Sequence, residues 1–386
     1  MNIIAPCVHD RFRYLCLFVT VLTSTLGGLD VVAEEVAPLG HWRVTGEMHE
    51  RREYGGGVVL LDGRVLAVSG HPVAGESIAS AELYDPETEK WEQTRSLIQA
   101  RNSGNMATLL KDGRVLLAGG HSNEEVVTGA EIYDPATGQW SNAGSLSVGR
   151  DPTATRLADG RVLVSGGINW YIRSGKVYDV CELLDPQAGQ WSVTGSLRTP
   201  RNTHRTALLD DGRVLAVAGY QDPETLLASA ELYDPTTGQW ELTGELPEPR
   251  AWFSIVKLQD GCVLVAGGYT GTPRKRTYLS SAVIYDPDTE KWSTVAPMGH
   301  QRAGCPLIEL PDGHVLVTGG IGRSGLEMKS AELYDPKSDT WRDVASMDTG
   351  RRNHRTALLP DGSVLVIGGS YVFGSSQLTN CEIFSR

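Results

Sequence analysis

The chain has 386 residues, of which 40% are hydrophobic, and this is enough apolar material for a large buried core. Its 47 acidic and 35 basic side chains give a formal net charge of −12. Such an acidic balance argues against nucleic acid as a partner, because phosphate binding requires a basic surface.

The first 33 residues have the composition of a secretory leader. Two arginines precede an apolar run over residues 14–26, and small residues before Glu34 fit a cleavage site after Ala33. The run is too short to span a bilayer. We therefore expect a signal peptide at residues 1–33 and a secreted or periplasmic mature protein with no membrane attachment; an uncleaved membrane anchor is the alternative.

Residues 40–48 read GHWRVTGEM, and related phrases return at 138–146 (GQWSNAGSL), 189–197 (GQWSVTGSL) and 238–246 (GQWELTGEL). Each later copy follows a run that ends in Asp-Pro, whereas the first copy follows only the leader. The chain thus begins with the end of a repeating unit.

The repeating unit is about fifty residues long, a period typical of solenoids and propellers. Its first mark is Asp-Gly, which begins at residues 62, 112, 159, 211, 260, 312 and 361. A pair of small residues follows each one, usually Gly-Gly. Phrases related to AELYDP then begin at 81, 130, 181, 230, 282 and 331, and Trp stands at 91, 140, 191, 240, 292 and 341.

Each unit predicts four short strands, as the fourth copy illustrates. Residues 206–209 form the first strand, and Asp-Gly predicts a two-residue hairpin turn with positive φ. Residues 213–217 are almost wholly apolar, so this strand should be covered on both faces, and the glycine pair after it lets neighbouring backbone come close. Residues 230–233 alternate as a half-buried strand does, and the strand with Trp240 follows.

A four-stranded antiparallel sheet repeated in this way predicts a β-propeller. A linear array is the alternative, but it leaves apolar faces bare at both ends. The seventh unit ends at residues 381–384 without a Trp strand, and Trp42 precedes Trp91 by one repeat. We therefore predict that residues 40–46 form the outer strand of the last blade and close the ring of one domain, residues 34–386.

The glycine pair, Tyr and Trp at these spacings resemble the Kelch motif over roughly residues 40–386. The resemblance implies an all-β, seven-bladed Kelch-type β-propeller, similar to that of galactose oxidase but without the oxidase residues. It also implies that the Trp side chains pack between adjacent blades. Leu184 in the Tyr position and Ser69 in place of the first Gly depart from the motif.

Kelch topology places the Asp-Gly and Asp-Pro turns on one face, where they are nearly identical in every unit. The other face carries the loop after the glycine pair and the link to the next blade, and these differ between units. We expect the binding surface there, because variation on a common scaffold is where specific contacts arise.

An arginine precedes the first strand of every unit: Arg52, Arg101, Arg150, Arg201, Arg250, Arg302 and Arg351. A ring of these arginines could hold a carboxylate, a sulfate or an acidic peptide. The alternative, which seven copies favour, is that each pairs with an acid of a neighbouring blade and braces the ring.

Histidines offer further candidates. His204 and His354 occupy the same position in blades four and seven, and we include them among the ligand-binding candidates. His71 and His121 follow the glycine pair in adjacent blades and are weak candidates for a metal site. We expect no resident metal and no other cofactor.

Aromatic residues on the variable face could stack on sugars or anchor a partner, or could fold back on the scaffold. The candidates for binding are Tyr220, Trp252 and Tyr269, with Trp170, Tyr171, Tyr371 and Phe373 on the same face. The basic run at 273–276 could dock an anionic partner or be a solvated loop tip.

The expected function is a monomeric, secreted or periplasmic module that binds a protein or a carbohydrate at the channel mouth. The main alternative is an epimerase-like propeller enzyme that acts on an acidic sugar. A copper-radical carbohydrate oxidase is less favoured, because similarity to galactose oxidase implies two His, two Tyr and a Cys on one metal, and further domains.

Overall fold

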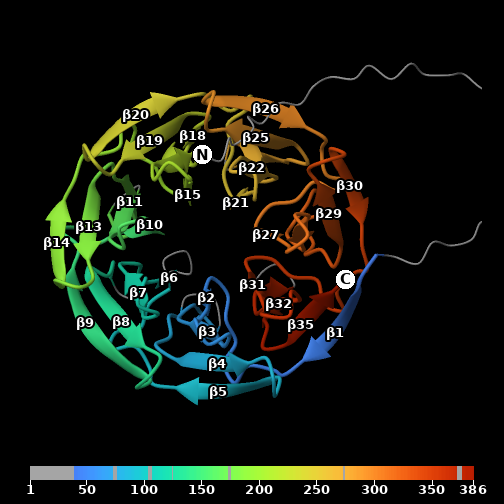
Figure 1. The fold of residues 1–386 in the computed structure, drawn as a ribbon, viewed down its shortest axis with the longest axis horizontal. Coiled ribbons are helices and arrows are strands. Elements are labelled where there is room, and N and C mark those ends of the chain that lie inside the picture. Colours follow the sequence, from blue (N-terminus) through green and yellow to red (C-terminus); the bar gives the residue numbers. More distant parts are fainter. Residues whose placement is uncertain are drawn as a thin grey trace, which may run out of the picture.

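The computed structural model describes residues 39–72, 76–102, 107–123, 125–172, 175–272, 274–371 and 376–386. The expected leader and Phe373 lie outside these ranges. The described chain is all-β, with seven radial sheets around a central axis (Figure 1), which confirms the predicted seven-bladed propeller. In the described part of the chain, no helix is long and apolar enough to cross a membrane.

Each of the seven sheets has four antiparallel strands arranged from the axis outward, and a short fifth strand is added in blade 3. Blades 1 to 3 contain β2 (Gly56–Val59), β3 (Val65–Val68), β4 (Ala81–Asp85) and β5 (Lys90–Thr94); β6 (Thr108–Leu109), β7 (Val115–Ala118), β8 (Gly129–Asp134) and β9 (Gln139–Ser145); and β10 (Asp151–Arg156), β11 (Val162–Asn169), β13 (Cys181–Asp185) and β14 (Gln190–Val193). Blades 4 to 6 contain β15 (Arg205–Leu208), β16 (Val214–Val217), β19 (Ala230–Asp234) and β20 (Gln239–Thr243); β21 (Ser254–Lys257), β22 (Val263–Ala266), β25 (Ala282–Asp286) and β26 (Lys291–Val295); and β27 (Leu307–Glu309), β28 (Val315–Thr318), β29 (Ala331–Asp335) and β30 (Thr340–Asp343). Blade 7 contains β31 (Arg355–Leu358), β32 (Val364–Ile367), β35 (Cys381–Ser385) and β1 (His41–Thr45).

Blade 7 joins the two ends of the described chain. β1 pairs antiparallel with β35, with Trp42 opposite Phe384 and Thr45 opposite Cys381. The Trp42 and Phe384 rings lie 5.1 Å apart, and the Trp42 indole N–H donates to the Ala345 carbonyl of blade 6 at 2.6 Å. The prediction that the N-terminal strand closes the ring is confirmed.

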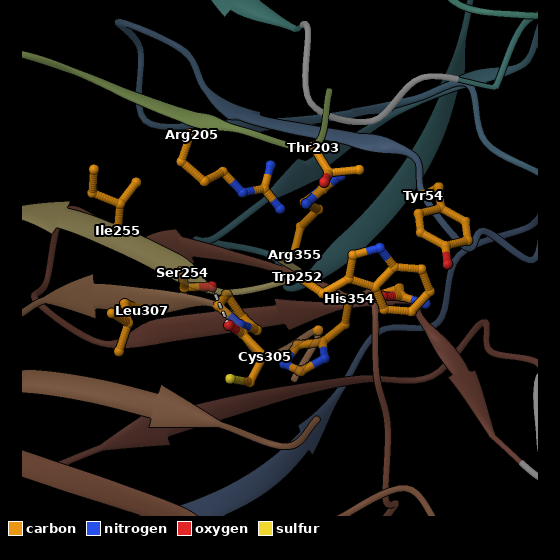
Figure 2. A pocket seen from close by; sticks show the side chains of 13 residues that line it. Tyr54, Thr203, Arg205, Trp252, Ser254, Ile255, Cys305, Leu307, His354 and Arg355 are labelled. Carbon is orange, nitrogen blue, oxygen red and sulfur yellow. Dashed lines mark hydrogen bonds between the residues drawn. The ribbon is translucent and has the colours of Figure 1, made fainter. Parts of the chain in front are cut away.

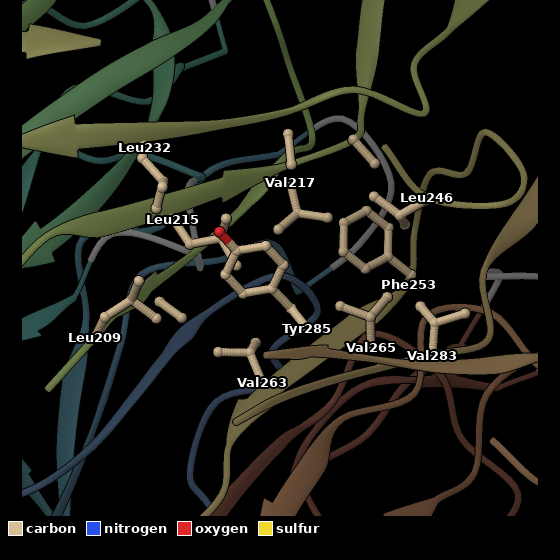
Figure 3. Close-up of a cluster of buried hydrophobic side chains, with 13 residues drawn as sticks. Leu209, Leu215, Val217, Leu232, Leu246, Phe253, Val263, Val265, Val283 and Tyr285 are labelled. Carbon is tan, nitrogen blue, oxygen red and sulfur yellow. The ribbon is translucent and has the colours of Figure 1, made fainter. Parts of the chain in front are cut away.

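The core lies between neighbouring blades. The second strand of every blade has its aliphatic side chains buried on both faces, as their apolar sequences predict. Between blades 4 and 5, Leu215 and Val217 pack with Val263 and Val265 around Tyr285 (Figure 3). Each blade therefore depends on both neighbours for the burial of its apolar surface.

Side-chain hydrogen bonds between neighbouring blades complement this packing. The Tyr of the third strand bonds through its hydroxyl to a Thr of the preceding blade: Tyr84 to Thr45, Tyr133 to Thr94, Tyr233 to Thr194 and Tyr285 to Thr243, at 2.6–2.8 Å. Trp indoles likewise donate to backbone carbonyls of the preceding blade: Trp140 to Arg95, Trp191 to Ala143, Trp292 to Gly244 and Trp341 to Ala296. The Trp side chains do lie between blades, as expected.

The second residue of each glycine pair is glycine in all seven units, and the geometry explains why. Gly219 has φ 93°, and a Cβ there would lie 2.4 Å from the Asn202 carbonyl oxygen. The first residue also has positive φ but tolerates Ser69 and Ala218. The predicted close approach of backbone at this pair is thus confirmed.

The Asp-Gly hairpins differ from the expected two-residue turns. Leu60 N–H donates to the Arg64 carbonyl and Gly63 N–H to the Leu60 carbonyl, so three residues form the loop. Only the glycine is left-handed, with φ 88° at Gly63. The Asp62 carboxylate accepts from Arg64 N–H, which stabilises the aspartate in a conformation with negative φ.

Candidate functional site

The two faces of the ring differ as the topology requires. On one face, the links between blades pair through isolated bridges with the segments after the glycine pairs, for example Asn202 with Tyr220 and Ala251 with Tyr269. We call this the loop face, and the opposite face, with the Asp-Gly and Asp-Pro turns, the turn face. Short strands add hairpins to the loop face: β12 (Lys176–Val177) on β11, β17 (Tyr220–Asp222) with β18 (Thr225–Leu226), β23 (Tyr269–Thr272) with β24 (Lys275–Tyr278), and β33 (Ser370–Tyr371) with β34 (Ser376–Gln377).

The seven repeated arginines are buried inside the ring. Arg52, Arg101, Arg150, Arg201, Arg250, Arg302 and Arg351 are each 2% exposed or less. Six of them pair at 2.5–2.8 Å with the Glu of the third strand: Glu82, Glu131, Glu182, Glu231, Glu332 and Glu382. Such side chains are withdrawn from any ligand, so the structure contradicts their candidacy as an anion-binding ring and supports the favoured alternative, a set of internal braces.

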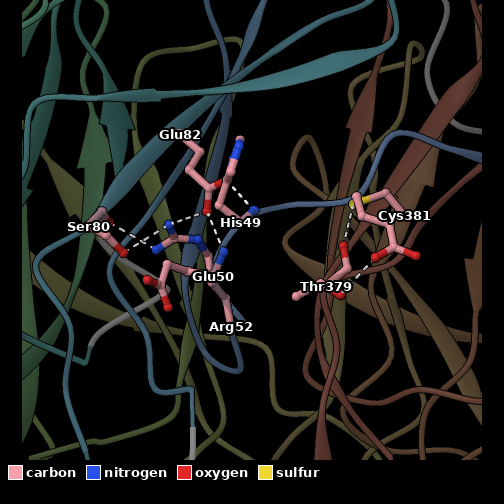
Figure 4. A network of polar contacts seen from close by, with 8 residues as sticks. His49, Glu50, Arg52, Ser80, Glu82, Thr379 and Cys381 are labelled. Atoms are coloured by element: carbon pink, nitrogen blue, oxygen red, sulfur yellow. Dashed lines mark hydrogen bonds and ion pairs between the residues drawn. The ribbon is translucent and has the colours of Figure 1, made fainter.

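The braces also differ from the expected cross-blade pairs, because the acid belongs to the blade that the arginine precedes. In blade 1, Glu82 accepts from Arg52 and from the backbone N–H groups of His49 and Glu50 (Figure 4). Arg52 donates in addition to the carbonyls of Ser69 and Ser80. Each brace therefore fixes the link that arrives from the preceding blade.

His204 and His354 are also packed between blades. They are 1% and 2% exposed, and their Nε2 atoms share hydrogen bonds with Ser165 Oγ at 3.1 Å and Thr318 Oγ1 at 2.7 Å. Burial, together with nearby arginines, holds the pKa of both imidazoles well below its usual value. The expectation that they bind a ligand is therefore corrected to a structural role.

These imidazoles predict acid sensitivity. The unfolded chain binds a proton at each near pH 6.5 while the folded protein does not, so stability present above that pH is lost as pH falls. From pH 7 to pH 5, the loss should be about 2 kcal/mol for each imidazole. Urea unfolding at both pH values should show a smaller loss in the His204→Asn/His354→Asn double variant, and an equal loss would contradict the assignment.

His71 and His121 lie close enough to interact: burial lowers the pKa of His71, and the charge of His121 lowers it further. Among the described residues, however, the one group of three or more metal-binding side chains is His300, Glu332 and Asp343. Glu332 there already accepts from Arg302 and from two backbone N–H groups. In the described chain, His71 and His121 belong to no group of three such ligand atoms within 4.8 Å of one another, although the Asp151 carboxylate lies 3.9 Å from His121 Nδ1.

A cavity of about 260 Å³ lies at the axis, where the links and the first strands of several blades converge (Figure 2). Its wall is formed by Tyr54, Thr203, Arg205, Trp252, Ser254, Ile255, Gly304, Cys305, Pro306, Leu307, Asn353, His354 and Arg355. The second residue after each repeated arginine is left-handed at Tyr54, Thr203, Trp252, Gly304 and Asn353, with φ between 52° and 62°. Because this conformation recurs in five blades, it belongs to the common scaffold of the links that shape the cavity wall.

Aromatic rings from opposite parts of the ring meet at the edge of the cavity. Tyr54 of the link into blade 1 and Trp252 of the link into blade 5 have centroids 6.4 Å apart, edge to face (Figure 2). Trp252 also contacts Tyr269 at 5.9 Å, and the Arg276 guanidinium lies over both rings. Of the aromatic candidates, Trp252 therefore reaches the cavity wall.

Tyr220 and Tyr269 support this aromatic cluster from the side. Tyr269 is 1% exposed and shares a hydroxyl contact with Tyr220, and neither lines the cavity. Of the two roles considered for these residues, packing against the scaffold agrees with the structure better than direct contact with a ligand does. Arg276 of the basic run is likewise engaged with the rings of the loop face.

The residues that the sequence analysis missed are Tyr54, Arg205 and Arg355. They stand two and four residues after the repeated arginines, where the seven links differ from one another. The variation of these link positions next to a constant arginine was the sequence signal that could have identified them as site residues. The cavity wall also holds Cys305 and His354, but it does not contain two His and two Tyr. Burial raises the pKa of the Cys305 thiol to about 11, so this thiol is inert at neutral pH.

Comparison with known proteins agrees with this architecture. The model of the KLHDC2/KLHL20/DRC7 Kelch-repeats domain matches residues 153–369, and the Kelch motif matches residues 104–147. No curated protein sequence matches the chain.

Two solved structures show the same fold at low identity. A fungal alcohol oxidase of the AA5 family, in complex with copper, is similar with a TM-score of 0.73 and 19% identity, over 90% of this chain and 76% of its own. The structure of YjhT is similar with a TM-score of 0.61 and 16% identity, over 78% of this chain and 99% of its own. With a family match over more than half of its length and seven radial blades, the chain belongs to the Kelch-repeat family of β-propellers.

Proposed function

We propose that this protein is a carbohydrate-binding propeller that works after export and holds its ligand in the axial cavity of the loop face. The observation that carries the proposal is the cavity wall itself. It is built from the link positions that differ between blades, while the repeated residues around it serve folding. Specific contacts on a repeated scaffold arise at such positions.

The dimensions favour a compact ligand. A cavity of about 260 Å³ lies just below the range of drug-sized pockets, roughly 300–1,000 Å³. A protein partner would instead require about 800 Å² of matching surface. One sugar unit, or the end of a longer chain, suits a half-open cavity with Trp252 and Tyr54 at its edge, because flat aromatic rings stack on sugar faces.

Binding fits the wall better than catalysis. His354 is the one histidine that lines the cavity, and it is buried against Thr318 with a lowered pKa. Burial also raises the pKa of Tyr54. General acid–base chemistry needs groups that titrate near the working pH, and neither residue does so.

A glycan array with labelled wild-type protein tests the proposal, followed by titration of the best ligand. Trp252→Ala should weaken binding roughly thirtyfold or more, as loss of a central aromatic anchor does. Trp170→Ala is the matched control, because Trp170 is 52% exposed on the loop face and does not line the cavity. Retained affinity in Trp252→Ala, or an equal loss in Trp170→Ala, would show that the cavity is not the site.

A further inference from the structure

Among the residues that the structure describes, two arginines and no carboxylate line the axial cavity. Arg205 comes from the start of β15 in blade 4 and Arg355 from the start of β31 in blade 7. Their Nε atoms donate to the backbone carbonyls of Phe253, at 3.5 Å, and Gly55, at 2.8 Å. Figure 2 shows the two guanidinium groups directed toward one another across the same space.

Like charges that share a secluded space repel one another strongly, because the effective dielectric constant there is far below that of water. Burial, with the charge of Arg205 as a further contribution, lowers the pKa of Arg355 to about 10. The Asp151 carboxylate acts on both arginines, although it is not part of the cavity wall.

A second, independent feature points to a ligand. Thr203 belongs to the same wall and is left-handed, with φ 52°, and the point of interest is its hydroxyl. It is buried and has no hydrogen-bond partner among the residues that the structure describes. Buried hydroxyls are normally satisfied, so an unpaired one in a cavity wall is suited to a bound molecule.

We propose that the cavity binds a ligand through a carboxylate group, which lies between Arg205 and Arg355. The inference rests on the proposed function and specifies its chemistry. The planar guanidinium fork matches the two oxygens of a carboxylate, and a negative charge between the two guanidinium groups reduces their mutual repulsion. The rest of the ligand then extends from the arginines toward Thr203, Trp252 and Tyr54 at the edge of the cavity.

Bromide tests the anion site in crystals of the full chain. We expect an anomalous bromide peak within hydrogen-bonding reach of both guanidinium groups, and loss of that peak in Arg205→Met and in Arg355→Met. Arg64→Met is the matched control, because it removes a partly exposed guanidinium from an Asp-Gly turn of the turn face and should leave the peak unchanged. A wild-type cavity without bromide overturns the inference.

Glucuronate and glucose, which differ in the carboxylate at one carbon, separate this inference from the proposed function. Titration followed by tryptophan fluorescence should show at least tenfold tighter binding of glucuronate, and Arg355→Met should abolish the difference. Equal binding of both sugars leaves the carbohydrate site in place and overturns the carboxylate inference. A third outcome is that bromide occupies the cavity but the protein binds neither sugar and no glycan of the array. This result supports the anion site and contradicts the carbohydrate ligand. Thermal unfolding of each variant confirms that it is folded.

Discussion

Deletion of residues 39–48 should lower the free energy of unfolding by more than about 5 kcal/mol, a large part of the stability of a typical domain. The deletion removes β1, and with it the contact between Trp42 and Phe384 and the hydrogen bond between Thr45 and Tyr84. It also removes Met48 from the core between blades 7 and 1. Loss of one large buried side chain alone costs about 3–5 kcal/mol. The exposed edge of β35 should in addition promote aggregation.

The measurement is urea or thermal unfolding of the full chain and of the deletion variant, with light scattering for aggregation. A synthetic peptide of residues 39–48, added in trans, should restore stability by pairing with β35. The same peptide with Trp42→Ala is the matched control and should restore less, because it lacks the indole that donates to Ala345. If the deletion variant unfolds like the full chain, β1 does not close the ring.

The fold could be predicted because the same sequence motif recurs in seven units. Asp-Gly, the glycine pair and Trp recur in register, so the strand order and the number of blades follow from counting. The position of the Trp42 segment predicted how the ring closes, because the seventh unit lacks an outer strand and this segment is the one left over. The exact turn geometry was missed, because Asp62 and Gly63 are compatible with two hairpin types and the hydrogen bonds of Leu60 decide between them.

The site was harder to predict for the opposite reason. The seven arginines became candidates because they are repeated, but a residue repeated in every blade usually serves folding. Arg201 forms a buried ion pair with Glu231, and Arg302 forms the equivalent pair with Glu332. The cavity arginines Arg205 and Arg355 stand in the same phrase, HRTALL, at residues 204–209 and 354–359, but the other five blades lack it. Their convergence depends on the curvature of the ring, which brings blades 4 and 7 to one axis, and a single sequence does not display that distance.

Glu231→Leu should destabilise the protein by about 3–5 kcal/mol, the cost of removing one partner from a buried ion pair. Arg201 and Glu231 are fully buried and lie 2.5 Å apart. The substitution leaves the guanidinium without its carboxylate and also leaves the backbone N–H groups of Arg198 and Thr199 without their acceptor. The double variant Arg201→Met/Glu231→Leu should recover part of the loss, because it no longer buries an unpaired charge.

Blade 5 supplies a natural control for this brace. Val283 stands where the other blades have Glu, and Arg250 pairs instead with Glu248 of its own link at 3.2 Å. Because the Glu248 side chain is 34% exposed, water screens this pair, and Glu248→Leu should cost only about 1 kcal/mol. Urea unfolding of both single variants compares the two braces directly. Equal losses would mean that burial of the carboxylate does not set the strength of the brace, and that the same-blade pairs stabilise the ring no more than a partly exposed ion pair does.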